Sequence, residues 1–278
     1  MSYVSAALPE GARRTTYDVP GGPLAAVELR PAGAVGTALL VPGFSGSKED
    51  FGPLLPLLVP GGRRIVALDL RGQYESAGPD DPAAYTVDAL AGDVLAVVRL
   101  LEQPVHLLGH SFGGLVARAA ALRDPGALAS LTLMSSGPQA LVGPRVDVLA
   151  FLPQVIAAGG MAAVADASAA LAEADPAGAG SPPEVLEFLR QRWLASSPTG
   201  LMAMGDALRT EPDRVDALRA TGLPVLVLHG ADDDAWSPAT QAEMAGRLGA
   251  AYAVVPGRHS PAVEAPEATA LTLLRFWA

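Results

Sequence analysis

One short strand-to-helix stretch constrains the fold of this 278-residue chain more than any other feature. An apolar run that ends at Gly109 is short enough to be a buried strand, and from Leu115 onward apolar residues recur at helical spacing. Between the two lies Ser111, which Gly113 follows in a G-x-S-x-G pattern. Such a turn leaves no room for a Cβ beside the serine and points the positive end of the following helix at it. The pattern therefore predicts that Ser111 is a nucleophile; the alternative is a plain turn that holds a serine.

Apolar runs alternate with helical patterns along much of the chain. Uninterrupted apolar runs are typical of strands covered on both faces. One occurs at residues 37–41. Further strand signals occur at 64–69, 130–134, 223–229 and 251–255, and helical patterns occur at 48–58, 84–101 and 266–277. A hairpin over residues 15–30 predicts an antiparallel edge. The alternation predicts an α/β fold, with a mostly parallel sheet and helices on both faces.

The strand signal is absent between residues 138 and 221, where three helical patterns separated by Pro, Gly and Ser take its place. They cover residues 146–172, 183–195 and 201–218. Because the sheet pattern resumes at Leu223, we expect 138–221 to be a helical cap inserted into one core made of residues 1–137 and 222–278.

The stretch 148–165 within this insertion is nearly uncharged and approaches the ~20 residues of a membrane span. Pro153, Gly159 and Gly160 interrupt it. We therefore expect cap helices that face an apolar pocket, and no membrane span.

A serine hydroxyl needs a base to become a nucleophile, and the chain contains four histidines. His259 follows the last predicted strand in a rigid Pro- and Gly-containing loop, so we predict that it is the general base. His106 lies inside a predicted strand and suits a structural role. His110 adjoins Ser111, where the backbone direction makes a hydrogen bond to it awkward, and His229 ends a strand and suits packing.

Several motifs together resemble the α/β-hydrolase family, in its serine-nucleophile, esterase- or lipase-like members with a helical cap. The resemblance covers nearly the whole chain, and it implies an eight-stranded type of sheet. In family order the motifs are Pro42-Gly43-Phe44, Asp69-Leu70-Arg71-Gly72 with Ser76, the turn around Ser111, the turn Gly230–Trp236 and His259-Ser260-Pro261.

The triad acid should follow a strand, between the serine and the histidine in chain order. Three adjacent aspartates, Asp232 to Asp234, are the candidates in this turn. Charge repulsion would raise the pKa of any of them that lay close together. The family pattern usually places the acid three residues after the glycine, at Asp233. Asp234 is the second choice, and Asp232 suits capping of the turn.

The resemblance also implies an oxyanion hole formed by two backbone amides, those of Phe112 and Phe44. Two positions depart from the family pattern. Pro42 stands where the family has a histidine, and Tyr74 stands where it often has a glycine.

The expected activity is hydrolysis of a smallish, apolar carboxylic ester through an acyl-enzyme, without a metal or organic cofactor. Thioesters, lactones, amides or carbon–carbon bonds are alternative targets of the same triad. A non-catalytic small-ligand sensor is an alternative of another class. We expect His110, Trp236, Phe151 and Trp193 to contact the substrate, with Phe188 a further pocket wall, although aromatic residues at helical spacing are more often core.

The composition limits the kinds of molecule that this protein is expected to bind. A formal charge of −10 and scattered arginines argue against nucleic acid, which leaves a small-molecule substrate and leaves homo-oligomerisation open. The chain has no cysteine, and residues 1–14 show no apolar h-region of a secretory signal. A cytoplasmic location is the expectation that follows.

Overall fold

The computed structural model describes residues 7–174 and 181–278. Residues 1–6, part of the stretch interpreted as lacking a secretory signal, and residues 175–180, part of the predicted insertion, lie outside the described residues.

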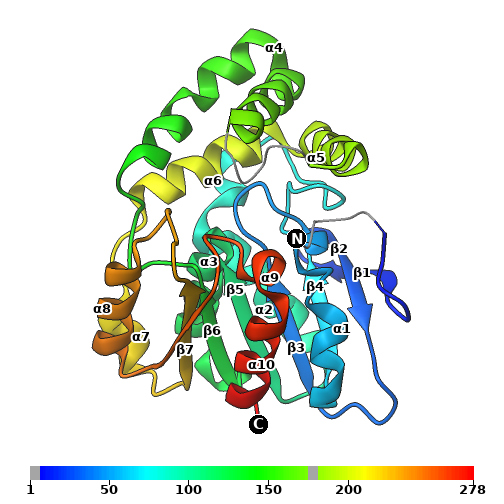
Figure 1. Ribbon diagram of the computed structural model, residues 1–278, viewed down its shortest axis with the longest axis vertical. Coiled ribbons are helices and arrows are strands. Elements are labelled where there is room, and N and C mark those ends of the chain that lie inside the picture. Colours follow the sequence, from blue (N-terminus) through cyan, green and yellow to red (C-terminus); the bar gives the residue numbers. More distant parts are fainter. Residues whose placement is uncertain (1–6, 175–180) are drawn as a thin grey trace.

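Within the described residues, eight strands form one sheet in the order β1-β2-β4-β3-β5-β6-β7-β8 (Figure 1). Strand β2 runs antiparallel to its neighbours β1 and β4, and every other neighbouring pair is parallel. The strands are β1 Arg13–Val19, β2 Gly22–Leu29, β3 Thr37–Val41, β4 Arg64–Leu68, β5 Val105–His110, β6 Ser130–Met134, β7 Val225–Gly230 and β8 Ala251–Val255. The predicted α/β-hydrolase fold class is confirmed.

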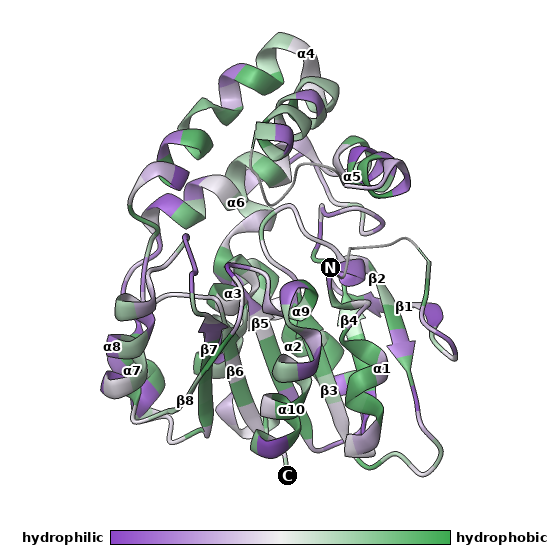
Figure 2. Cartoon of the chain, in the orientation of Figure 1, coloured by the Kyte–Doolittle hydropathy of each residue, from purple (hydrophilic) through white to green (hydrophobic). Residues whose placement is uncertain are grey.

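Helices cover both faces of the sheet because alternate strand residues point to opposite sides. In β3, Leu39 and Val41 join one apolar cluster, whereas Ala38 and Leu40 join the other. The first cluster packs under α2 (Val87–Leu100), α3 (Phe112–Arg123) and α8 (Pro238–Leu248), and the second under α1 (Leu55–Leu58), α9 (Pro261–Glu264) and α10 (Pro266–Phe276). Figure 2 shows the strands as apolar ribbons between these layers.

Two predicted helices are interrupted beside a proline. The helix expected at 48–58 is a 3₁₀ turn, Lys48–Phe51, followed by α1, with Gly52 and Pro53 between them. The helix expected at 201–218 is divided at Pro212. Proline lacks the backbone N–H that a helix interior needs, so the helical hydrogen-bond pattern is interrupted there.

In the described part of the chain between β6 and β7 lie four helices: α4 (Pro144–Ala174), α5 (Pro183–Ala195), α6 (Pro198–Thr210) and α7 (Val215–Ala220). Helices α4 to α6 lie beyond the carboxyl ends of the parallel strands (Figure 1). Helix α7 packs instead against α3 and α8 of the core. The part of the insertion that covers the sheet edge is therefore α4 to α6.

Among the described residues, α4 is the one helix long and apolar enough to cross a membrane. It is kinked at Gly159 and Gly160, and Gly160 has φ of 63°. Each arm of the helix is thus about 15 residues, or ~22 Å, which is shorter than the ~30 Å hydrocarbon core of a bilayer.

Candidate active site

Ser111 stands at the tip of the turn between β5 and α3. Its backbone has φ of 53° and ψ of −119°, a left-handed conformation that a residue with a side chain rarely adopts. A Cβ on Gly109 would lie 2.2 Å from the Gly113 carbonyl oxygen, and one on Gly113 would lie 2.3 Å from the Pro42 carbonyl oxygen. Both glycines are therefore required for the chain to bring Ser111 to this edge of the sheet.

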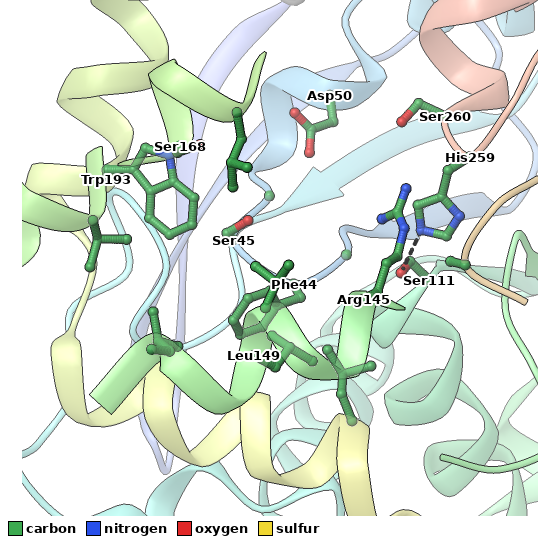
Figure 3. Close-up of a pocket in the computed structure, with 18 of the residues that line it drawn as sticks. Phe44, Ser45, Asp50, Ser111, Arg145, Leu149, Ser168, Trp193, His259 and Ser260 are labelled. Carbon is green, nitrogen blue, oxygen red and sulfur yellow. Dashed lines mark hydrogen bonds between the residues drawn. The ribbon is translucent and has the colours of Figure 1, made fainter. Parts of the chain in front are cut away.

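The imidazole of His259 joins Ser111 to Asp233. His259 lies in the loop between β8 and α9, and its Nε2 is 2.9 Å from the Ser111 Oγ (Figure 3). Its Nδ1 is 2.9 Å from Asp233 Oδ1. Because an ionised carboxylate only accepts hydrogen bonds, Nδ1 carries the proton, and Nε2 of the neutral ring accepts the serine hydroxyl.

Asp233 follows β7 and is buried, with 5% of its surface exposed. The Ala235 amide donates to Oδ1 at 3.0 Å, and the Gln241 side chain donates to Oδ2 at 2.9 Å. Burial alone would raise the pKa of Asp233, but the hydrogen bonds from His259, Ala235 and Gln241 hold that pKa below its usual value. The carboxylate is therefore ionised at neutral pH.

The two neighbouring aspartates face away from this chain of hydrogen bonds. Asp234 is exposed and accepts hydrogen bonds from Arg145 at 2.7 Å and Arg258 at 3.1 Å. Asp232 is also exposed, and its amide donates to the Gly257 carbonyl at 2.9 Å. Of the three aspartates, the structure brings Asp233 to the imidazole.

Each of the other three histidines makes a hydrogen bond to a group other than the Ser111 hydroxyl. His106 Nδ1 is 2.8 Å from Ser130 Oγ, and His229 Nε2 is 2.8 Å from the Tyr252 hydroxyl. His110 Nε2 donates to the backbone carbonyl of His259 at 2.8 Å. Burial and the nearby His259 lower the pKa of His110 to about 4, so its ring is neutral and steadies the loop that carries His259.

The amides of Phe44 and Phe112 lie on two segments that meet at Ser111. Phe112 is the first residue of α3, where helix amides have no partner within the helix. A Cβ on Gly43 would lie 3.1 Å from the Ser111 Cβ, which places the Gly43–Phe44 peptide beside the serine. Neither amide donates a hydrogen bond to another residue in the described part of the chain. Both amides therefore keep an unused hydrogen-bond donor among the described residues.

A cavity of about 910 Å³ opens above Ser111, between the core loops and the cap. Ser111 and His259 lie at one end of it and Trp193 at the other (Figure 3). Its walls are mainly apolar, and α4 supplies a large part of them. Arg145, Asp50 and Arg192 are its charged members. Apolar side chains in its lining include Phe44, Leu149, Phe151, Leu152, Val155, Leu171 and Trp193.

Among the residues expected to contact substrate, His110, Phe151 and Trp193 line this cavity. Trp236 does not: its indole is buried in the core, and Nε1 donates to the Gln139 carbonyl at 3.0 Å. Phe188 is also outside the described lining and packs edge-on against Tyr74 at 5.7 Å.

Residues 38–271 match the sequence pattern of the alpha/beta hydrolase family. The chain belongs to the α/β-hydrolase family. A non-heme haloperoxidase of Rhodococcus erythropolis is 31% identical to this hydrolase over 73% of this chain and 77% of its own length. A Variovorax paradoxus protein named for carbamate hydrolysis is 37% identical, but the match covers 35% of this chain and 37% of that relative.

Solved structures resemble this hydrolase over nearly its full length. A hydrolase from Pseudomonas aeruginosa superposes with a TM-score of 0.79 at 26% identity, covering 96% of this chain and 98% of that one. An esterase from Thermogutta terrifontis superposes with a TM-score of 0.76 at 25% identity, covering 95% and 97%. The family resemblance seen in the motifs is confirmed, and the protein is an enzyme of the hydrolase class.

Two glutamines of this hydrolase were missed by sequence reasoning. Gln241, on the first turn of α8, is fully buried and donates to both the Asp233 carboxylate and the Trp236 carbonyl. Gln73 is buried behind the Gly43–Phe44 peptide and donates to the Gly43 carbonyl at 2.8 Å. The available signal for Gln241 was a glutamine at a core-facing position of an amphipathic helix; for Gln73 the chain offers no local signal.

Proposed function

We propose that this protein hydrolyses apolar carboxylic esters through an acyl-enzyme on Ser111. The observation that carries the proposal is the continuous chain of hydrogen bonds from the Ser111 hydroxyl through His259 to Asp233, at the end of an apolar cavity. A ligand sensor would need the cavity but not the hydrogen bonds that join Ser111, His259 and Asp233.

In the proposed reaction, His259 Nε2 takes the hydroxyl proton as Ser111 Oγ attacks the ester carbonyl carbon. The Phe44 and Phe112 amides hold the negative oxygen of the tetrahedral intermediate, and donors of this kind contribute about 3 to 4 kcal/mol each. His259 then gives its proton to the leaving alcohol. A water molecule, deprotonated by the same nitrogen, releases the acid, while the ionised Asp233 stabilises the imidazolium in both halves of the reaction.

The cavity favours a bulkier substrate than the smallish ester expected from the sequence. Its volume of about 910 Å³ lies near the upper end of the ~300–1,000 Å³ usual for small-molecule sites. Its walls from α4 are apolar, so a long or branched acyl group gains free energy by leaving water. We propose an uncharged ester with a medium-length or branched apolar part.

The test combines p-nitrophenyl esters of increasing acyl length with labelling by a fluorophosphonate. Wild-type protein should give a burst of nitrophenol, prefer acyl chains longer than acetyl, and take up one label on Ser111. Ser111→Ala should abolish labelling and lower kcat by about 10⁴-fold or more, and His259→Ala should slow labelling strongly.

Ser168→Ala is the matched control, because Ser168 lines the same cavity from α4. It should keep both the label and the burst. Wild-type protein that is folded and binds apolar esters, yet neither turns them over nor takes up the label, would establish the sensor instead.

A further inference from the structure

The peptide between Gly43 and Phe44 lies beside Ser111 and carries one of the two amides of the proposed oxyanion hole, and the orientation of this peptide decides whether that amide can bind an oxyanion. In a planar trans peptide the carbonyl and the N–H point in opposite directions. A group that fixes the Gly43 oxygen therefore also aims the Phe44 N–H. What binds this oxygen controls half of the proposed oxyanion hole.

Two donors reach the Gly43 oxygen from the described part of the chain. One is the Gly46 amide, at 3.1 Å, which belongs to the same loop and moves with it. The other is Nε2 of Gln73, at 2.8 Å, from the loop that follows β4. Pro42, the residue before the peptide, has no polar side chain that could assist. Gln73 is thus the side chain that anchors the peptide to the rest of the core.

The backbone of Gln73 is fixed by hydrogen bonds, and its side chain is buried, so the side chain has little conformational freedom. Its own amide donates to the Leu70 carbonyl at 2.9 Å, and its carbonyl accepts from the Ser76 amide at 2.9 Å. Gln73 is 2% exposed, and its Nε2 is also 4.0 Å from the Met204 sulfur of α6.

The orientation of the Gln73 amide follows from its partner. Because the Gly43 carbonyl can only accept a hydrogen bond, the nitrogen of the Gln73 amide must face it. The amide oxygen, Oε1, is then buried without a hydrogen-bond partner among the described residues. Because a buried unpaired oxygen is unfavourable, the hydrogen bond from the Gln73 nitrogen is the favourable polar contact of this side chain.

We infer that Gln73 is a positioning residue for the oxyanion hole: by holding the Gly43 carbonyl it aims the Phe44 amide at the oxygen that becomes negative in the transition state. The inference rests on the proposed function. It also accounts for how the loop is supported where Pro42 replaces the family histidine.

The test replaces Gln73 by methionine, which has nearly the same length and volume and no donor. We expect kcat for an activated ester to fall about 10- to 100-fold, with KM changed less than about threefold. The loss is smaller than the 10²–10³-fold that follows removal of an oxyanion donor, because the amide is loosened but stays in place.

A second measurement separates positioning from general damage. A thiocarbonyl sulfur accepts hydrogen bonds poorly, so wild-type protein should hydrolyse an ester much faster than the matching thionoester. Gln73→Met should reduce this ratio about as much as it reduces kcat, because a loosened hole loses its preference for oxygen. Gln73→His, which restores an N–H at similar reach, should recover most of the ratio.

Met204→Leu is the matched control, since the Met204 sulfur lies 4.0 Å from the same Gln73 nitrogen. It should leave the ester-to-thionoester ratio unchanged. If Gln73→Met fails to fold, as judged by circular dichroism, the ratio is measured in Gln73→Ala.

If a folded Gln73→Met or Gln73→Ala protein kept the wild-type ester-to-thionoester ratio, the inference would be overturned. A variant that is less stable or has a changed KM, but keeps that ratio, would overturn it in the same way. Failure of the proposed function is a separate result, because it shows as absence of the burst and of the label in wild-type protein.

Discussion

At the scale of single residues, three adjacent aspartates with the same chemistry are separated by their surroundings. Asp233 is buried and accepts hydrogen bonds from His259, Ala235 and Gln241, whereas Asp234 is exposed and paired with two arginines. An exposed pair of that kind contributes about 0–1 kcal/mol to stability. Position in the turn, and not residue type, therefore decides which carboxylate can serve the imidazole.

Replacing each aspartate by asparagine should show this separation. Asp233→Asn is expected to lower kcat by about 10⁴-fold, because an amide at this position favours the wrong tautomer of His259. Asp234→Asn should change kcat less than about threefold. Steady-state hydrolysis of a p-nitrophenyl ester measures both, and a larger loss in Asp234→Asn would transfer the role of triad acid to that residue.

At the scale of elements, the turn from β5 into α3 is locked against the loop that follows β3. The Cα of Gly113 lies so close to that loop that a Cβ would meet the carbonyl oxygens of Pro42 at 2.3 Å and Val41 at 2.5 Å. These are backbone atoms, which no change of rotamer can move aside. The serine turn is therefore packed directly against the backbone that leads into the Gly43–Phe44 peptide.

Gly113→Ala should force these two segments apart. We expect the free energy of unfolding to fall by about 2–3 kcal/mol and ester hydrolysis to fall with it, since overpacking against backbone is costly. Gly126→Ala is the matched control, because a Cβ there meets nothing within 4 Å. Its free energy of unfolding, from urea titration, should stay within about 0.5 kcal/mol of wild type. Equal effects of the two substitutions would contradict the locking of the turn.

At the scale of the whole molecule, the features predictable from sequence were those with a local signal. Strands such as β3 and β6 are short apolar runs covered on both faces, and the turn at Ser111 carries its glycines beside it. The Gln73 hydrogen bond to Gly43 joins residues 30 positions apart, so no periodicity marks it. Trp236 shows the same limit, because an aromatic residue in a turn can face either a cavity or the core.

The ionisable groups that the fold buries also make the stability of the whole molecule depend on pH. His106, on β5, is buried beside Ser130, and burial together with the charge of Arg63 lowers its pKa to about 4. In the unfolded chain its pKa is about 6.5. Between these values the unfolded state binds a proton that the native state does not, so His106 contributes stability above pH 6.5 that is lost as the pH falls toward 4. Asp69 changes the stability in the opposite direction, because burial raises its pKa to about 6 despite its bond to Lys48. Between pH 6 and its unfolded pKa the native state binds the extra proton, so this group favours folding as the pH falls.

His106→Gln isolates the histidine from this background. Between pH 6 and pH 4.5 the free energy of unfolding of wild-type protein should decrease more steeply than that of the variant, by up to one proton, or about 1.4 kcal/mol per pH unit. Ser130→Ala removes the partner of His106 without removing the ring. It should lower stability at every pH while leaving most of the slope in place. Urea titrations at several pH values measure all three proteins, and a His106→Gln slope equal to that of wild type would mean that the native protein protonates His106 as readily as the unfolded chain does.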